Sequence, residues 1–279
     1  MSDVSFYLSQ IIDGVAYGSI YGVLALSIVI LYRANKLFNF AQTEMATLSV
    51  VCMFFLMKKF SFSIAFGLTI LISFIVGILL HFSIMRILTE QKKVLHSGQA
   101  IVTIGFYIIF NSLSAYILGD EQQPFPSPFS VDNFGVLGVG VSYLSLGILG
   151  VTIGLVILVY LVFRFTNIGL VFEAVAEDIG AARLRGIHAS NVLALAWGFA
   201  AVTAATGAIL IAPILYLSPS MLASVFAYSL FAVVIGGLES PIGAFLGGVL
   251  VGVVENLASN ISFIGSELKF VAVALMLIL

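Results

Sequence analysis

Charged side chains gather in one short stretch of this otherwise apolar chain, residues 167–188. Acids come first and arginines last, an order that stabilises a helix because each charge opposes the helix dipole at its own end. Apolar residues recur between them at helical spacing and give the helix one apolar face. We therefore expect an ordered, water-facing helix whose charges could fix the register of a docked protein. The charged residues are Glu173, Glu177, Asp178, Arg183 and Arg185.

Glycines set the expected limits of this helix. Gly180 should split it into two short pieces, because glycine weakens a helix interior. Gly186 is well placed to end it, since glycine accepts the left-handed backbone that follows many helices. The stretch cannot lie inside a bilayer, because each charge at membrane depth would cost about 2.5–3.5 kcal/mol.

A second group of polar residues interrupts an apolar run where a lipid-facing helix would carry leucine. Asn39, Gln42 and Glu44 stand at the start of that run. Ionisable residues inside a membrane usually serve function, whereas at the interface they cost little. The group could line a substrate path, or it could cap a helix and rest at the interface.

The glycine-rich segment 236–248 forms the other interruption. Paired interruptions in the two halves of a chain indicate a transport path in transporters built from repeats. The internal similarity here is faint and leaves a repeat undecided. We expect a translocation pathway that combines both interruptions, with Asn39, Gln42, Glu44, Gly236, Gly237, Glu239 and Pro241.

Other notable side chains have simpler interpretations. Glu255 lies near a predicted helix end, and Asn111 and His81 are typical of hydrogen bonds between helices. Glycines at fourfold spacing favour close helix packing. They occur at Gly14, Gly18 and Gly22, at Gly150 and Gly154, at Gly243 and Gly247, and at Gly248 and Gly252.

Enzyme signatures are absent from the sequence. It has no Gly-Lys dipeptide, hence no phosphate-binding loop of the GxxxxGK type, and it has no HExxH. Cys52 is the only cysteine, so neither an intrachain disulfide nor a cysteine-based metal site can form. We expect no catalytic residue, no metal site and no cofactor in this chain, and any ATP that drives it must bind to another chain.

Composition defines the class of protein. The 279 residues are 61% hydrophobic and only 9% charged, with a mean hydropathy of +1.20, whereas soluble domains carry about a quarter charged residues. The apolar runs are continuous and about twenty residues long, unlike the short alternating segments of a transmembrane barrel. The sequence predicts an all-α polytopic membrane protein with a single membrane domain over residues 1–279. The net charge of −2 gives no reason to expect a nucleic-acid partner.

Eight apolar runs could cross a membrane, and a ninth starts near Lys269. The ninth has about ten apolar residues before residue 279, too few to span, so we expect the natural chain to continue. We expect nine spans in all, or eight if residues 237–243 form a re-entrant segment. The first eight runs cover approximately residues 6–32, 38–57, 60–87, 100–118, 141–163, 191–211 (stopping at Pro213), 219–237 and 242–257.

Basic residues set the expected orientation. Cytoplasmic loops carry an excess of Lys and Arg, and placing residues 167–188 in the cytoplasm leaves only Lys58, Lys59 and Lys269 outside. The N-terminus and the proline-rich loop 119–140 then lie outside as well. We expect that loop to have little regular structure.

Segments in order along nearly the whole chain resemble one family. GLVFEAVAEDIGAARLRGIHASNVLALAW is similar to the cytoplasmic loop in the permease subunits of branched-chain amino acid ABC importers, with its A-x-A-E-D, A-A and L-x-G-I elements. DGVAYGSIYGVLALSIVILY resembles the family's opening helix. NFAQTE and GGLESPIGAFLGG stand where the family has N-F-A-H-G-E and a glycine-rich segment.

The resemblance implies a helical permease, surrounded by the lipid of a bacterial inner membrane, that pairs with a second, homologous permease. Two cytoplasmic ATPase subunits would bind ATP and magnesium below it, and a periplasmic binding protein would deliver substrate above. Residues 167–188 would be the coupling helix, which switches the spans between outward- and inward-open states. The residues implied in this coupling are Glu173, Ala174, Ala176, Glu177, Asp178, Ala181, Ala182, Arg183 and Gly186.

The sequence departs from the family at both interruptions. Gln42 and Thr43 replace His and Gly, and Glu239 replaces a glycine, with Pro241 one place early. These departures leave the substrate open between branched-chain amino acids, other amino acids, urea and short-chain amides. Two further classes remain, a membrane scaffold without transport and an ion-coupled secondary transporter or channel, in which the cation would bind Glu44, Glu239 or Glu255.

Overall fold

The computed structural model describes residues 3–86, 96–119, 121–130, 132–136, 139–259, 271 and 273–275. Six of its helices are long and apolar enough to cross a membrane, and two shorter apolar helices, α2 and α10, accompany them. The chain is therefore an all-α, polytopic membrane protein. Its helices are α1 (Asp3–Asn35), α2 (Gln42–Leu56), α3 (Phe62–Leu80), η1 (His81–Met85), α5 (His96–Leu118), α6 (Tyr143–Phe165), α7 (Asn167–Glu177), α8 (Ile179–Leu184), α9 (Ala189–Leu215), α10 (Ala223–Gly236) and α11 (Pro241–Ser259).

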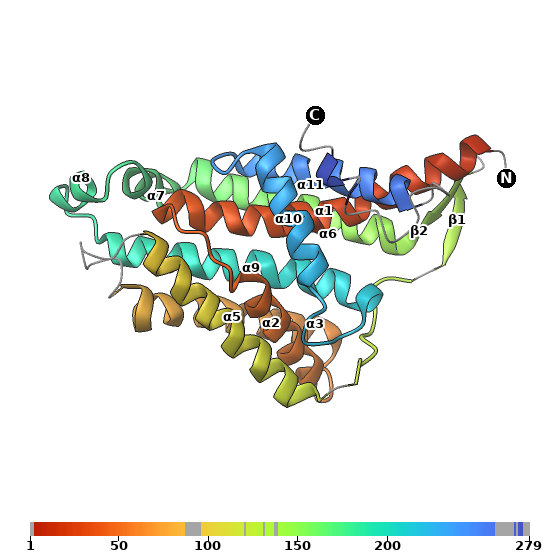
Figure 1. The fold of residues 1–279 in the computed structure, drawn as a ribbon, viewed down its shortest axis with the longest axis horizontal. Coiled ribbons are helices and arrows are strands. Elements are labelled where there is room, and N and C mark those ends of the chain that lie inside the picture. Colours follow the sequence, from red (N-terminus) through yellow and green to blue (C-terminus); the bar gives the residue numbers. More distant parts are fainter. Residues whose placement is uncertain are drawn as a thin grey trace.

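Helices α1 and α9 form the centre of the bundle and run side by side in opposite directions along its long axis (Figure 1). Both are rich in Ala, Leu, Ile and Val, and nearly every residue of α1 from Ala16 to Leu31 is buried. α11 packs along α1, and α3 packs along α9. Most side chains of α3, α5 and α6 are not buried, so these helices form the outer layer.

Glycines bring the backbones of paired helices into contact. A Cβ at Gly18 on α1 would lie 2.7 Å from the carbonyl oxygen of Gly248 on α11, and one at Gly77 on α3 would lie 2.5 Å from that of Trp197 on α9. Neither position has room for a side chain, so the close packing predicted for the glycines of α1 and α11 is confirmed. At Gly150 on α6, no atom of the described residues comes within 4 Å of the Cβ position, so the same spacing makes no such contact there.

Two parts of the chain are built alike. α1, α2 and α3 form a long helix, a short one and a longer one, and α9, α10 and α11 follow the same order. α2 contacts α9, just as α10 contacts α1. Both long helices are followed by a residue with a left-handed backbone, Lys36 (φ 56°) after α1 and Tyr216 (φ 60°) after α9. This correspondence favours an internal repeat, which the sequence left undecided.

Some helix boundaries differ from the predicted runs. α2 begins at Gln42, and residues 36–41 before it have no regular structure. That segment is largely buried in protein, where irregular backbone is tolerated at membrane depth. α9 continues through Pro213 to Leu215. A proline removes one helical hydrogen bond, but neighbouring helices can support the turn and let the helix continue.

The loop 119–140 contains more regular structure than predicted. β1 (Asn133–Val136) and β2 (Val139–Ser142) pair as an antiparallel hairpin. Backbone hydrogen bonds of 2.9 and 2.8 Å also join Gln123 to Leu217, between α9 and α10. Strand pairing gives partners to backbone groups that a structureless loop would leave to water. The predicted ninth run from Lys269 lies largely outside the described residues.

The two ends of the bundle differ. α7 and α8 lie beyond the ends of the long helices on one side, and the N-terminus and the β1–β2 hairpin lie at the other (Figure 1). The charged stretch 167–188 and the hairpin are therefore separated by the length of the helices that would cross the membrane.

Candidate functional site

The charged stretch folds as two short helices held against the end of the bundle. α7 buries Phe172 and Val175, and α8 buries Ala182, each at most 3% exposed. The Phe172 ring meets the Phe163 ring of α6 edge-on, with the centroids 4.7 Å apart. This packing makes α7 and α8 an ordered extension of the bundle, with α7 in direct contact with α6.

Asp178 separates α7 from α8. Its Oδ1 accepts hydrogen bonds from the backbone nitrogens of Gly180 (2.7 Å) and Ala181 (3.0 Å) and so caps the first turn of α8. The break expected at Gly180 therefore falls two residues earlier, and its cause is this cap. Gly186 follows α8 with φ +81°, which confirms it as the end of the stretch's helical part.

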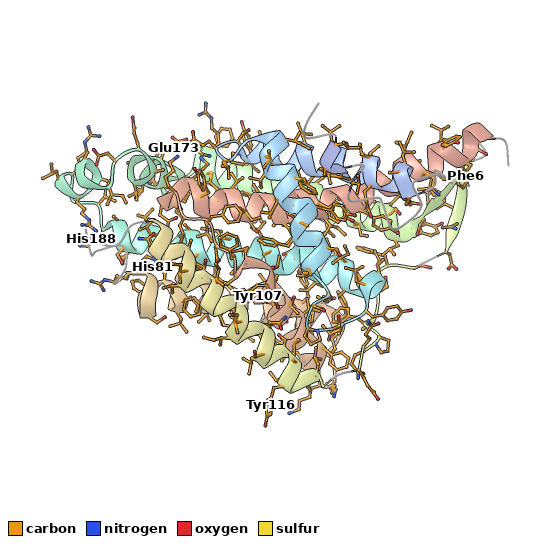
Figure 2. The ribbon with its side chains drawn as sticks, viewed as in Figure 1. Phe6, His81, Tyr107, Tyr116, Glu173 and His188 are labelled. Atoms are coloured by element: carbon orange, nitrogen blue, oxygen red, sulfur yellow. The ribbon has the colours of Figure 1, made fainter. Side chains whose placement is uncertain are left out.

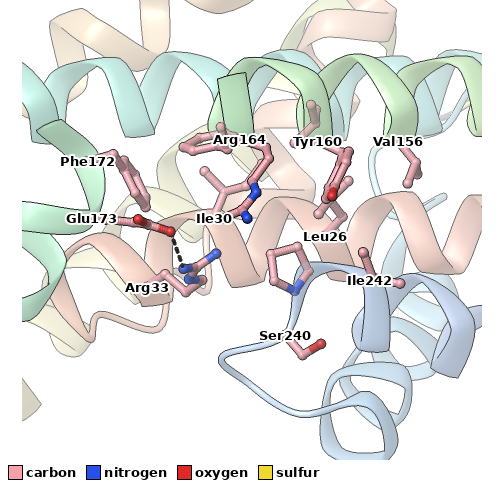
Figure 3. Close-up of a pocket in the computed structure, with 13 residues that line it drawn as sticks. Leu26, Ile30, Arg33, Val156, Tyr160, Arg164, Phe172, Glu173, Ser240 and Ile242 are labelled. Atoms are coloured by element: carbon pink, nitrogen blue, oxygen red, sulfur yellow. Dashed lines mark ion pairs between the residues drawn. The ribbon is translucent and has the colours of Figure 1, made fainter. Parts of the chain in front are cut away.

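Glu173 is tied to the bundle. Its carboxylate lies 3.9 Å from the Arg33 guanidinium in the last turn of α1, and Figure 3 shows the two side chains facing each other. A partly exposed ion pair contributes about 0–1 kcal/mol. Its main effect is therefore to position α7 relative to α1.

The outward face of the stretch combines charges, small side chains and one leucine. Leu184 is 92% exposed, although the sequence predicted that the apolar residues of stretch 167–188 share one buried face. The sequence offered no signal for this, because the spacing of α7 and α8 is reset by the Asp178 cap. The predicted coupling residues that are exposed are Glu173, Glu177, Asp178, Ala181, Arg183 and Gly186, with Ala174 and Ala176 half-buried beside them.

A buried polar cluster occupies the start of α2. Asn39, Gln42 and Glu44 are each 1% exposed, so protein surrounds them on all sides. Asn39 Nδ2 donates to Gln42 Oε1 at 2.9 Å, and Gln42 Nε2 donates to the carbonyl oxygen of Ala200 on α9 at 2.9 Å. These bonds hold the non-helical segment before α2 against α9.

Asn111 of α5 joins this cluster to the second half of the bundle. Its Nδ2 lies 3.3 Å from Glu44 Oε2 and 3.1 Å from the carbonyl oxygen of Pro219. Pro219 belongs to the segment before α10, so the entries to both short helices meet at one amide. The sequence predicted Asn111 as a hydrogen-bonder between helices, but nothing in the pattern singled out Pro219.

The glycine-rich interruption lies elsewhere, at the surface. Gly237 has φ +92° and Pro241 begins α11. Between them, the Glu239 carboxylate accepts a hydrogen bond from Lys36 Nζ, and this bond and the Lys36 charge hold the pKa of Glu239 below its usual range. The structure therefore brings Gly236, Gly237, Glu239 and Pro241 to the end of α1 and not into the buried cluster of Asn39, Gln42 and Glu44.

Two further polar residues that the sequence singled out join helices. Glu255 Oε2 accepts a hydrogen bond of 3.0 Å from Tyr21 Oη across the contact between α11 and α1. The Tyr21 ring stacks on that of Tyr228, with centroids 5.1 Å apart. His81 Nε2 lies 3.3 Å from Ser190 Oγ, as expected for a side chain that bonds between helices.

Comparison with known proteins places this arrangement in a family. The family described as branched-chain amino acid transport system / permease component matches residues 10–279. The chain belongs to this permease family. The resemblance carried by the charged stretch 167–188 and the glycine-rich segments is thereby confirmed, and a channel, an ion-coupled transporter or a scaffold is not favoured.

Relatives match the permease over most of their length. The high-affinity branched-chain amino acid transport system permease protein BraD of Pseudomonas aeruginosa is 26% identical, over 100% of this chain and 94% of its own. The corresponding LivH protein of Escherichia coli K12 is also 26% identical, with 98% and 92% covered. A probable LivH permease of Methanocaldococcus jannaschii is 24% identical, with 89% and 80% covered.

Proposed function

We propose that this permease is the transmembrane subunit of an ATP-driven importer of branched-chain amino acids, working by alternating access in a bacterial inner membrane with its N-terminus outside. The observation that carries the proposal is the α7–α8 element. In a chain of this family, it is anchored to the bundle by packing on Phe172 and presents an exposed face of charges and small residues. The names of the relatives support the substrate, since each states branched-chain amino acid transport.

ATP must bind to partner subunits, because the sequence has no nucleotide-binding loop. Two cytoplasmic ATPase subunits bind ATP and magnesium, a second homologous permease completes the membrane part, and a periplasmic binding protein delivers substrate at the hairpin end. The ATPase contacts the exposed face of α7–α8, where small side chains allow a close approach. Residues of this contact are Glu177, Ala181, Arg183 and Gly186, with Ala174 and Ala176 at its edge, while Glu173, Asp178 and Ala182 keep the element in place.

Coupling then follows from the contacts of α7. Closure of the ATPase pair displaces α7–α8 as a unit, and the Phe163–Phe172 contact and the Arg33–Glu173 pair pass this displacement to α6 and α1. α1 carries α11 with it, because their glycine-lined backbones pack directly against each other. Rigid-body movement of packed helices between two arrangements is a common form of such switching.

The translocation pathway passes the buried cluster of Asn39, Gln42 and Glu44. The carboxylate suits the ammonium group of an amino acid and the amides suit its carboxylate. Gly236, Gly237, Glu239 and Pro241 lie nearer the cytoplasmic exit, beside Lys36. Urea, a short-chain amide or another amino acid is the second candidate substrate, because Gln42, Thr43 and Glu239 differ from the residues typical of the family.

Ala181→Trp tests the docking face. A bulky side chain there should block the ATPase, so uptake of labelled leucine and co-purification of the ATPase subunits should each fall at least about tenfold, the effect of about 1.4 kcal/mol. Ala181 is the better site than Gly186, whose left-handed backbone would strain any substitution. Tyr116→Trp, at an exposed residue far from α8 (Figure 2), is the matched control and should change neither quantity. Normal uptake by Ala181→Trp at normal membrane levels would refute docking at this face.

A further inference from the structure

A cavity of about 180 Å³ opens between the ends of α1 and α6, α7 and the start of α11 (Figure 3). Its inner wall is aliphatic, with Leu26, Ile30 and Val159. Its mouth is basic and polar, with the Arg33 and Arg164 side chains reaching in from α1 and α6. The cavity therefore suits a ligand that has a charged group next to a hydrocarbon part.

The charge at the mouth favours an anion. The Arg33 guanidinium nitrogen lies 3.9 Å from the nearest carboxylate oxygen of Glu173. This distance allows an ion pair but is too long for a direct hydrogen bond. Among the described residues, Arg164 has no carboxylate within ion-pair distance. Two guanidinium groups thus face one carboxylate, and their donors match the oxygens of a phosphate.

The position of the cavity identifies where the anion comes from. Arg33 and Arg164 each lie in the last turn of a helix that could span the membrane. Ile153, about three turns before Arg164 on α6, and Leu246, about one turn after Ile242 on α11, are 46% and 55% exposed. The basic mouth is therefore at the water boundary of the bundle, and an apolar surface runs from it toward the membrane centre, as a phospholipid requires.

We propose that this cavity binds an anionic phospholipid, with the phosphodiester between Arg33 and Arg164 and the start of one acyl chain along Leu26 and Ile30. The lipid belongs to the cytoplasmic leaflet, a statement that rests on the orientation given in the proposed function. Basic pockets between spanning helices on that side are suited to anionic head groups. Because the phosphate competes with Glu173 for Arg33, bound lipid loosens the link between α7 and α1.

The test measures lipid retained by the full-length permease, purified in mild detergent with palmitoyl-oleoyl phosphatidylglycerol or with the matching phosphatidylcholine, by native mass spectrometry. Wild type should retain phosphatidylglycerol over phosphatidylcholine by about tenfold, since each basic residue near a membrane surface gives a several-fold preference. The double variant Arg33→Gln, Arg164→Gln should lose this preference. The matched control Arg183→Gln, Arg185→Gln removes two exposed arginines outside the cavity and should keep it.

Further arms separate a lipid from other occupants. Ile242→Trp, which narrows the cavity and leaves both arginines, should also reduce retention of phosphatidylglycerol. Glycerol 3-phosphate should compete only weakly, and equal competition would overturn the proposal in favour of a free phosphate site. Equal retention of both lipids by wild type, unchanged preference in the arginine double variant, or a cross-link from Tyr160→Cys to a partner permease would also overturn it. Lipid retention needs neither ATP nor transport, so a failure of leucine uptake would count against the proposed function and leave this result intact.

Discussion

Asn111 shows how much a single half-buried amide can hold together. Of the described residues, it is the one that donates to the Glu44 carboxylate, and it also donates to the carbonyl group of Pro219. A buried carboxylate without a donor is costly, because the protein cannot replace the water that it has lost. Asn111 thereby couples the entry of α2 to the entry of α10.

Asn111→Ala should lower the stability of the permease by about 1–3 kcal/mol, the cost of leaving a buried polar group unsatisfied, and should reduce leucine uptake. The measurement is the thermal unfolding midpoint in detergent, together with uptake at equal membrane levels. Ser114→Ala is the matched control, because Ser114 is a buried polar residue of the same helix and its hydroxyl has no partner among the described residues. Equal unfolding midpoints for Asn111→Ala and wild type would contradict this role of the amide.

Glu239 gives the surface link between Lys36 and the α10–α11 turn a defined pH dependence. The hydrogen bond from Lys36, followed by its charge, lowers the pKa of Glu239 below the ordinary 4.5. Because the pKa of Glu239 is lower in the folded state than in the unfolded state, its ionised carboxylate stabilises the folded protein above pH 4.5. This contribution is lost as the pH falls through the lowered pKa. The unfolding midpoint of wild type should therefore exceed that of Glu239→Gln at pH 7, and the difference should shrink as the pH falls below 4.5 and also in high salt. A difference that grows on acidification would contradict this assignment.

At the scale of elements, some glycines allow two helix backbones to touch, whereas others in the same sequence pattern make no such contact. Gly18 and Gly150 both belong to fourfold glycine patterns, yet only Gly18 faces another backbone among the described residues. The sequence shows the spacing but not which helix lies opposite, because that depends on how the spans assemble.

Gly18→Ala should cost about 1–3 kcal/mol, as for other overpacked sites, because the new methyl group would lie 2.7 Å from the Gly248 carbonyl oxygen. Gly150→Ala should cause no loss, since its Cβ position is open and alanine favours a helix over glycine by about 1 kcal/mol. Chemical unfolding in detergent of the two variants, beside wild type, provides the comparison. If both substitutions had the same effect, the α1–α11 contact would not depend on its glycines.

The helices themselves could largely be predicted, since continuous apolar runs determine both their type and their approximate place. The capped break at Asp178 and the burial of the non-helical segment 36–41 could not. The burial of segment 36–41 depends on contacts between distant parts of the chain, such as the hydrogen bond from Gln42 to Ala200. The break depends on which side-chain atom caps the backbone, here Asp178 Oδ1 on the nitrogens of Gly180 and Ala181. Asn39, Gln42 and Glu44 were recognisable as unusual residues, but their bond to Asn111 and its link to Pro219 depend on the tertiary arrangement.

At the scale of the whole molecule, the long helices separate two chemically different ends. One end carries α7, α8 and the basic cavity, and the other carries the hairpin and the N-terminus (Figure 1). This polarity is what a directional transporter requires, because each end must meet different partners.

Cysteine labelling tests the proposed orientation of these ends. In a Cys52→Ser background, an impermeant maleimide should label Ser130→Cys in intact spheroplasts and Arg185→Cys only in inside-out vesicles, since both positions are exposed and lie on opposite sides. The reverse labelling pattern would invert the topology and move the docking face to the wrong side of the membrane.

The central claim is tested most directly by uptake of labelled leucine into proteoliposomes that contain this permease with its partner subunits and binding protein. ATP is supplied on the side of α7–α8 or omitted, and unlabelled isoleucine, urea or glutamate competes. The account predicts uptake that requires ATP and is blocked by isoleucine. Uptake that is blocked only by urea or glutamate would keep the class of transporter and correct its substrate. Uptake that proceeds on an ion gradient without ATP would contradict the account.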